Sequence, residues 1–255
     1  MRNKDIRQAY DKLVIKIKGY FKKSNFERAV IGVSGGIDSA LSAKLVAEAI
    51  GKKNVHALII PVKGISSEEN IRDAVEFCAL NGISYSLIFI NDFIKEFEKV
   101  EWEQNKAAKM NTISRIRAVL LYNYANSNNA LVIGTSNKTE ILLGYFTKYG
   151  DGAVDVEVIG DLFKAEVRGL AKFLKIPERI IRKAPTAELY PGQTDEKELG
   201  VTYDELDKIL GLYAEGKSIN GIIAKGFEKK TVESVIEKVK KNEHKRNMPI
   251  VVRIS

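Results

Sequence analysis

The sequence has one cysteine, Cys78, among its 255 residues. A single thiol cannot close an internal disulfide, and it excludes a metal cluster built on several cysteines. Cys78 lies in a helical pattern of apolar residues with Ile71, Ala74 and Val75. This pattern predicts a buried core thiol rather than a catalytic nucleophile.

Long apolar runs are missing as well. No stretch approaches the roughly 18 apolar residues that a membrane span needs. The first residues, MRNKDIRQAYDKL, are charged and amphipathic, without the apolar core of a signal peptide. We therefore expect a cytoplasmic protein that begins with an amphipathic helix over residues 3–23.

The chain carries a net charge of +8, which suits either nucleic acids or small anionic molecules. The lysines are spread along the sequence and gather only near residues 238–246, and no aromatic and glycine-rich nucleic-acid signature accompanies them. The charge therefore favours small anionic partners, and we expect neither a nucleic acid nor a membrane as a partner.

The most informative stretch is residues 29–46, AVIGVSGGIDSALSAKLV. Its apolar start predicts a buried strand over 29–33, Gly35 and Gly36 predict a sharp turn, and helical spacing begins at Asp38. A strand, a glycine turn and a helix N-terminus form an anion site, because free backbone N–H groups and the positive end of the helix dipole converge there. Ser34 and Ser39 add hydroxyl donors.

This turn lacks the lysine of the common P-loop, and Asp38 stands at the equivalent polar position. A carboxylate beside a phosphate is unfavourable unless a cation lies between them, which predicts Mg²⁺ bound through oxygen. The segment SGGIDS resembles the signature of the ATP pyrophosphatases, which split ATP between its α- and β-phosphates and adenylate a substrate. Taken alone, the same six residues also fit a strand-to-helix turn that binds nothing.

Short apolar strands alternate with helical patterns through the first half of the chain. We predict strands at 29–33, 55–62, 85–90 and 131–134, and later helices at 163–174, 178–183, 204–214, 219–225 and 230–245. Helices are also expected at 92–100 and 106–126, and Ser66 with Glu69 predicts a capping box for a helix that ends near Leu80. The alternation predicts an α/β fold, a parallel sheet with helices on both faces and a helical C-terminal part, in one domain over residues 1–255.

In such sheets the ligand lies beyond the carboxyl ends of the strands, so the turns that follow the strands should share one edge. Thr135 and Ser136 follow the strand at 131–134, as Ser34 follows the first strand. Glu140 is either a second carboxylate ligand of the Mg²⁺ ion beside Asp38 or an ordinary acidic residue in a first helical turn.

Two later segments are rich in polar and turn-forming residues. In FTKYGDG, residues 146–152, two glycines flank Asp151 and mark a close backbone approach, while Lys148 is a candidate partner for a phosphate or carboxylate. The polar stretch 184–203, with its two prolines at 185 and 191 and a glycine at 192, is either a surface loop or a closing lid. We favour the lid, because the stretch is longer than most connections.

Several segments together resemble the NAD synthetase family in its ammonia-dependent, single-domain form. They are, in chain order, SGGIDS, ISRIRA, GTSNKTE, FTKYGDG, KAPTAEL, GVTYDELD and EHKR, between about residues 30 and 249. The resemblance implies a homodimer with a Rossmann-like sheet. It also implies the last step of NAD biosynthesis, in which ATP and Mg²⁺ are used to convert deamido-NAD and ammonia into NAD, AMP and pyrophosphate.

The resemblance assigns site residues by position. It implies that ATP is bound by Gly32, Val33, Ser34, Gly35, Gly36, Ile37, Asp38, Ser39, Thr135, Lys164 and Thr186, deamido-NAD by Arg115, Lys148, Asp155, His244 and Lys245, and Mg²⁺ by Asp38 and Glu140. The positive side chains suit a dinucleotide that carries two phosphates and a carboxylate. From the pattern alone, Arg115 and Arg117 equally suit a solvated helix face, and His244 suits a helix end.

The expected reaction has two steps. The nicotinate carboxylate attacks the α-phosphate of ATP and pyrophosphate leaves; ammonia then attacks the mixed anhydride and AMP leaves. We expect catalytic contributions from Ser34, Asp38 and Ser39 at the turn, and from Asp151 as the carboxylate that binds ammonium and accepts its proton. The chain has no room for a glutaminase domain, so free ammonia or a separate glutaminase would supply the nitrogen.

Two other functions fit the same ATP turn. One is another ATP pyrophosphatase, either tRNA-modifying or GMP-forming, although a tRNA thiolation enzyme would usually need catalytic cysteines. The other is a non-catalytic adenine-nucleotide sensor, which would bind nucleotide without releasing pyrophosphate. Pyrophosphate release with each substrate separates these functions.

Overall fold

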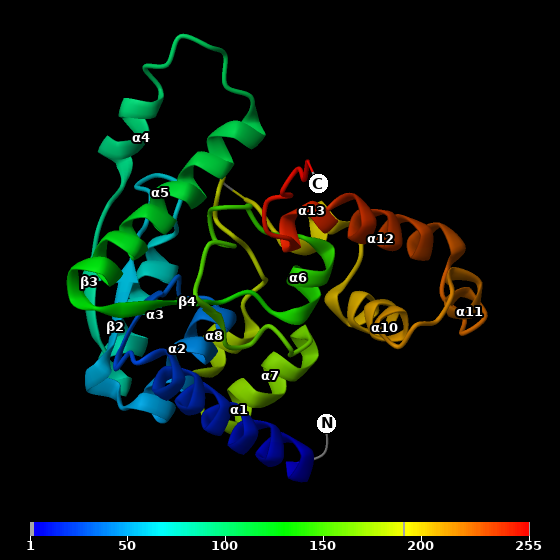
Figure 1. Cartoon of the computed structure of the whole chain (residues 1–255), viewed down its shortest axis with the longest axis horizontal. Coiled ribbons are helices and arrows are strands. Elements are labelled where there is room, and N and C mark those ends of the chain that lie inside the picture. The colour runs from blue at the N-terminus through cyan, green and yellow to red at the C-terminus, as the bar shows by residue number, and fades with distance from the viewer. Residues whose placement is uncertain (1–2, 191, 255) are drawn as a thin grey trace.

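The structure is a computed structural model that describes residues 3–190 and 192–254. A five-stranded parallel sheet lies at its centre, in the order β3-β2-β1-β4-β5 (Figure 1). The strands are β1 (Arg28–Gly32), β2 (Val55–Ile59), β3 (Ser84–Leu87), β4 (Ala130–Gly134) and β5 (Val156–Glu157). This arrangement confirms the predicted α/β class and the parallel sheet.

Helices pack on both faces of the sheet. The helices that precede the C-terminal part are α1 (Asn3–Ser24), α2 (Ile37–Ile50), α3 (Glu68–Asn81), α4 (Asn91–Phe97), α5 (Lys106–Asn128), α6 (Lys138–Leu143), α7 (Lys164–Phe173) and α8 (Glu178–Arg182). Ala29 and Ile31 of β1 join the apolar cluster with α1, α2, α3, α7 and α8, whereas Val30 joins the cluster with α5. This division follows from the period-2 alternation of side chains along a strand.

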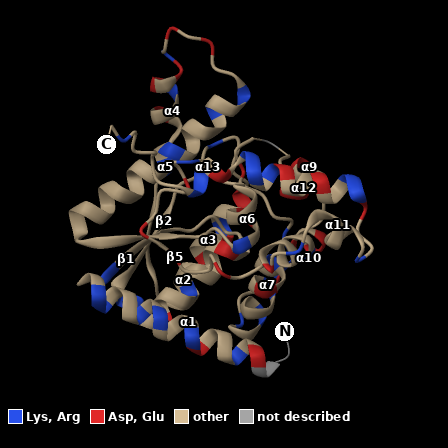
Figure 2. Ribbon diagram, turned by 45° about the vertical axis from the view of Figure 1, so that its right-hand side comes forward, with Lys and Arg blue, Asp and Glu red and all other residues tan. Residues whose placement is uncertain are grey.

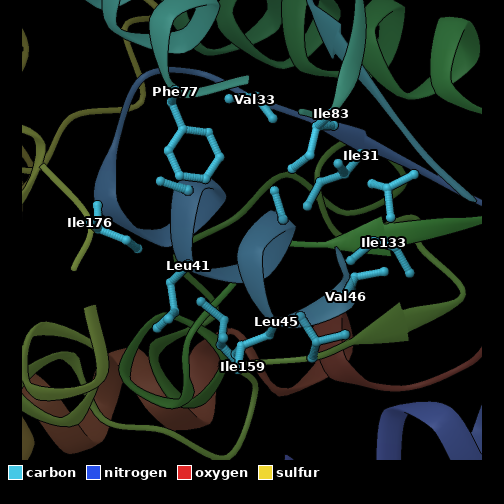
Figure 3. Close-up of a cluster of buried hydrophobic side chains, with 14 of the residues drawn as sticks. Ile31, Val33, Leu41, Leu45, Val46, Phe77, Ile83, Ile133, Ile159 and Ile176 are labelled. Carbon is cyan, nitrogen blue, oxygen red and sulfur yellow. The ribbon is translucent and has the colours of Figure 1, made fainter. Parts of the chain in front are cut away.

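The larger of these two clusters forms the core beneath the predicted anion turn. Figure 3 shows Ile31 and Val33 facing Leu41, Leu45 and Val46 of α2. Burial of these aliphatic side chains fixes α2 against β1, and so fixes the short turn that joins them.

The C-terminal part is helical and has an apolar cluster of its own. It consists of α9 (Asp195–Leu199), α10 (Tyr203–Ala214), α11 (Ile219–Ile223), α12 (Lys229–Lys241) and α13 (Glu243–Arg246). This part extends to one side of the sheet, while α4 and the start of α5 project at another (Figure 1). Lys and Arg are spread over helices throughout the molecule (Figure 2).

Several local predictions need correction. The elements without a predicted counterpart include β5, whose two residues are too short to show alternation, the short α6, and α9, a single turn inside the 184–203 stretch. The N-cap of α3 is Ser67, whose side chain accepts from the N–H of Asn70, and not Ser66. Ser66 instead accepts from the N–H of Val62.

The structure bears on the predictions for the single cysteine and for membrane-spanning segments. The Cys78 thiol is buried, and burial raises its pKa to about 12, which confirms a core thiol. Among the described residues, no helix is long and apolar enough to cross a membrane. Pro191, named with the 184–203 stretch, lies outside the described residues.

Candidate functional site

The turn between β1 and α2 is closed by its own serines. The N–H of Ser34 donates to Ser39 Oγ at 3.2 Å, and Ser39 Oγ donates to the Gly36 carbonyl at 3.0 Å. Gly35 has φ +84°, and a Cβ there would lie 2.2 Å from the carbonyl oxygen of Asn70 in α3. Only glycine fits this position, because the backbone is left-handed and in contact with a neighbouring helix.

A buried lysine joins the two carboxylates that were predicted to bind a metal. Lys164 Nζ lies 2.5 Å from Asp38 Oδ2 and 3.3 Å from Glu140 Oε1, and its side chain is 1% exposed. Burial would lower the pKa of Lys164, but the charges of Asp38 and Glu140 outweigh it and raise that pKa. Burial raises the pKa of Glu140 to about 7, against the opposing charge of Lys164.

The donor set of this pair suits a magnesium ion. Among the described residues, no group of three or more His, Cys, Asp or Glu is placed to hold a metal ion. Asp38 and Glu140 nevertheless converge on one cation, and Asn137 Nδ2 donates to Asp38 Oδ1 at 2.9 Å. Proteins bind Mg²⁺ through one or two carboxylates together with substrate phosphates, so these residues fit the ion.

The backbone of Lys164 is positioned by Asp207, a residue of the GVTYDELD segment. Asp207 accepts from the Thr139 hydroxyl at 2.5 Å and from the N–H of Ala165 at 2.8 Å. A carboxylate at the N-terminus of α7 satisfies a free N–H group there and stabilises the helix dipole. No pattern in the sequence indicates this role, because nothing local links residue 207 to residue 165.

Lys164, Asp38 and Glu140 form a group that we call the Lys164 centre. The 184–203 stretch contacts this centre at one end and α3 at the other. The hydroxyl of buried Tyr203 lies 3.0 Å from Asp195 Oδ2 and 3.2 Å from Glu140 Oε1. Within the stretch, Glu188 accepts from the N–H of Ser67 at the N-cap of α3 at 3.1 Å, and Lys183, the residue just before the stretch, pairs with the buried Asp73 of α3. The stretch is therefore tied to both sides of the anion turn.

The residues assigned to deamido-NAD by resemblance gather from four separate segments. Arg115 of α5 donates to the carbonyl of Lys148 at 3.3 Å, and Lys148 Nζ donates to the carbonyl of His244 in α13. Lys245 Nζ donates to the carbonyls of Gly144 and Phe146 at 2.8 and 2.9 Å. The structure therefore joins α5, the 144–152 turn and α13 into one cluster.

Asp151 braces the turn of this cluster, whereas Asp155 is held by β4 and α5. Asp151 Oδ1 accepts from the Ser114 hydroxyl at 2.6 Å and from the N–H of Thr147 at 2.9 Å. Asp155 accepts from the N–H of Val132 at 2.7 Å and from the hydroxyl of Tyr122 at 3.2 Å. Both carboxylates thus have structural hydrogen bonds in addition to any contact with a substrate.

Two residues assigned to ATP lie at the edges of the site. Thr135 follows β4 directly and is partly buried beside Ser136. Thr186 accepts from the N–H of Glu188, and Glu188 in turn accepts from the N–H of Ser67 at the start of α3. The described contacts connect Thr186 to the α3 side of the turn rather than to the Lys164 centre.

Sequence analysis also missed Glu157 on β5. Its carboxylate accepts from the N–H of Ser136 at 3.1 Å. A Cβ on Gly134 would lie only 2.3 Å from Glu157 Oε2, so this carboxylate fits only because residue 134 has no side chain. Burial raises the pKa of Glu157 to about 8, and the charges of Glu140 and Asp151 add to this effect. Only the pairing of β5 with β4 brings this carboxylate to the strand ends.

Replacing Glu157 with glutamine should therefore flatten the pH dependence of stability. The folded pKa lies above the unfolded value, so the folded state holds an extra proton between about pH 4.5 and about 8, and stability falls as pH rises through that range. We expect Glu157→Gln to gain about 2 to 4 kcal/mol over wild type at pH 8 and little at pH 4.5. Urea unfolding at both pH values measures this, with exposed Glu215→Gln as the matched control. The same change in unfolding free energy between pH 4.5 and pH 8 for Glu157→Gln and wild type would contradict this prediction.

Comparison with known proteins gives a consistent result. A profile of the family described as NAD synthase matches residues 9–249. The chain is 45% identical over 238 residues to an NH(3)-dependent NAD(+) synthetase of Archaeoglobus fulgidus, with 93% of each chain covered.

Two solved structures share the fold over nearly their whole length. An NMN synthetase from Francisella tularensis has a TM-score of 0.87 at 34% identity, with 98% of this chain and 99% of that chain covered. An NH3-dependent NAD synthetase from Campylobacter jejuni, in complex with the nitrate ion, has a TM-score of 0.82 at 33% identity, with coverages of 97% and 99%. The anion turn, the Lys164 centre and these matches agree, and the chain belongs to the NAD synthase family.

Proposed function

We propose that this protein catalyses the ATP-dependent amidation of deamido-NAD by ammonia, with NAD, AMP and pyrophosphate as products. The observation that carries the proposal is the buried Lys164, which joins Asp38 of the anion turn to Glu140 in a chain of the NAD synthase family. The two carboxylates outnumber the one ammonium group, so the site suits Mg²⁺ bound together with a phosphate, and the N–H groups at the start of α2 lie beside it to stabilise a leaving pyrophosphate.

The first step forms a bond between the substrate carboxylate and the α-phosphorus of ATP and breaks the α–β bridge. The N–H groups in the first turn of α2 and the ammonium group of Lys164 would stabilise the departing pyrophosphate. When bound, Mg²⁺ held by Asp38 and Glu140 would neutralise phosphate charge. Thr135 and Thr186 would contact the nucleotide at the edges, and the other residues of the 32–39 turn would surround its phosphates.

The second step replaces AMP with ammonia at the activated carbonyl. Arg115, Lys148, Asp155, His244 and Lys245 would hold the dinucleotide. In support, hydrogen bonds link Arg115 to Lys148, Lys148 to His244 and Lys245 to residues 144–146, which brings three cationic side chains together. The stretch 184–203 would exclude water from the acyl-adenylate, as a lid tied to both sides of the turn can do.

Ammonium must lose a proton before it can attack, and Asp151 is the carboxylate that we assign to it. Asp151→Asn keeps an acceptor for Ser114 and Thr147 but removes the negative charge. We expect the ammonium concentration for half-maximal NAD formation to rise about tenfold at pH 7, with less effect at pH 9, where free ammonia is abundant. Steady-state kinetics at both pH values test this, and a full rate at pH 7 would rule the assignment out.

The proposal includes a homodimer of single-domain chains in the cytoplasm, supplied with free ammonia or by a separate glutaminase. Large apolar side chains are exposed on the projecting region of α4 and the segment that leads to α5, namely Phe93, Phe97 and Trp102. An exposed apolar patch of this kind supports a subunit interface.

The assay of this function measures pyrophosphate and NAD with ATP, Mg²⁺, deamido-NAD and ammonium, and then omits each in turn. Pyrophosphate release that requires deamido-NAD, with NAD only when ammonium is present, is the expected result. The similarity to an NMN synthetase favours the corresponding acid mononucleotide as the second candidate substrate, so it is assayed in parallel. Release stimulated by tRNA, or no release with any substrate, would overturn the proposal.

A further inference from the structure

Arg117 differs from its neighbour Arg115 in its surroundings, although both lie in the middle of α5. Arg115 is exposed, whereas Arg117 is partly buried and turns toward the sheet. Its Nε donates to the carbonyl of Ile60, just beyond β2, at 3.1 Å. The sequence pattern suited a solvated face for both arginines, and for Arg117 that interpretation is wrong.

The guanidinium of Arg117 has spare donors and no carboxylate partner. Nε provides its one hydrogen bond within the described part of the chain, where Arg117 forms no ion pair. A guanidinium carries five N–H groups in a planar fork that matches a carboxylate with two parallel hydrogen bonds. A partly buried guanidinium with spare donors and no ion pair among the described residues favours an anionic ligand.

The surroundings of Arg117 indicate which substrate it faces. Burial lowers the pKa of Arg117, and the charges of Asp151 and Glu188 raise it. Ser114, about one helical turn before Arg117 on α5, donates to Asp151 at 2.6 Å. Asp151 belongs to the turn that also carries Lys148, and Glu188 belongs to the 184–203 stretch. Arg117 therefore lies near the turn that we assign to the acid substrate.

A cleft of about 580 Å³ opens beside this position. Its lining includes Ile113, one helical turn from Arg117 along α5, and Val62, two residues beyond the carbonyl that Arg117 bonds. Leu189, next to Glu188, closes the same cleft. The apolar part of the lining suits an aromatic ring, and Arg117 lies one helical turn beyond the lining residue Ile113, next to the cleft and not in its wall.

We propose that Arg117 binds the carboxylate of the acid substrate and thereby distinguishes this substrate from its amide product. This inference rests on the proposed function. The carboxylate would accept two hydrogen bonds from the guanidinium fork before it attacks ATP. The product amide is neutral and offers one oxygen acceptor, so it would bind Arg117 less strongly and leave more easily.

Calorimetry with deamido-NAD and with NAD tests this role, because the two ligands differ only at this carboxyl group. We expect Arg117→Gln to weaken deamido-NAD binding by about 10- to 100-fold and NAD binding by less than about threefold. Arg117→Lys keeps the charge but not the planar fork, so its affinity for deamido-NAD should lie between those of wild type and Arg117→Gln. Exposed Arg72→Gln, with the same charge change, should match wild type for both ligands.

Three results would overturn the inference. Equal weakening of both ligands would mean that Arg117 binds the shared diphosphate or only supports the fold, and unchanged binding would mean that it faces no ligand. If circular dichroism shows that Arg117→Gln does not fold, Arg117→Lys takes its place. The ratio of its deamido-NAD and NAD affinities is then compared with the wild-type ratio. Failure of wild type to bind deamido-NAD overturns the proposed function as well, whereas wild-type binding with an unchanged ratio in the variants overturns only the role of Arg117.

Discussion

Replacing Gly35 with alanine is expected to reduce turnover by about 100-fold or more. The new Cβ would lie 2.2 Å from the Asn70 carbonyl oxygen and 2.9 Å from its carbon, in a backbone with φ +84°. Asn70 belongs to the first turn of α3, whose N-cap bond fixes its position. Neither side can yield freely, so the turn must move away from α3 and its N–H groups lose their alignment toward phosphate.

A matched control separates the contact from the backbone angle. Gly216 has φ +82°, almost the same as Gly35, but a Cβ there meets nothing within 4 Å. Gly216→Ala should cost about 1 kcal/mol of stability and leave turnover intact, whereas Gly35→Ala should cost about 2 kcal/mol or more and weaken ATP binding. Urea unfolding and ATP-dependent pyrophosphate release measure both effects. Equal behaviour of the two variants would contradict the proposed contact.

Replacing Lys164 with alanine is expected to lower both stability and activity. Removal of the ammonium group leaves Asp38 and Glu140 facing each other without their common cation, at side-chain exposures of 20% and 15%. Breaking a buried ion pair in this way costs about 3 to 5 kcal/mol. The loss should shrink toward low pH, because protonation of the two carboxylates removes their repulsion.

Magnesium gives a second measurement on the same variant. In the Lys164→Ala variant, Mg²⁺ can take the position between the two carboxylates that the ammonium group leaves, so Mg²⁺ should raise its melting temperature more than that of wild type. Lys138→Ala is the control, since Lys138 pairs with the exposed Asp161 at 2.8 Å and should cost less than about 1 kcal/mol. The same small loss in both variants, with no extra effect of Mg²⁺, would show that Lys164 does not bridge the carboxylates.

The elements that carry local signals could be predicted from the sequence. The strand, glycine turn and helix at residues 28–50 are specified by short apolar runs and by the left-handed angle that Gly35 adopts, so their existence and order follow from neighbouring residues alone. The same is true of the parallel sheet, because alternating strands and helices leave few other folds. Boundaries differed by a few residues, as with β2, which ends at Ile59 rather than at 62.

The parts that depend on distant residues could not be predicted. The distance between Lys148 and His244 is set by the packing of α12 and α13, about which no local pattern carries information. Likewise the ion pairs of Asp73 with Arg179 and Lys183 join α3 to residues more than a hundred positions away. Arg115 and Arg117 have the same chemistry in the sequence, and only the contact with Ile60 separates them.

The central claim is that the substrate carboxylate forms an anhydride with AMP, and isotope transfer tests it most directly. Deamido-NAD labelled with ¹⁸O in its carboxylate is incubated with the protein, ATP, Mg²⁺ and ammonium, and the products are analysed by mass spectrometry. The mechanism predicts one labelled oxygen in AMP, because the oxygen that attacks phosphorus leaves with it, and none in pyrophosphate. Label in pyrophosphate, or unlabelled AMP formed together with NAD, would contradict the account.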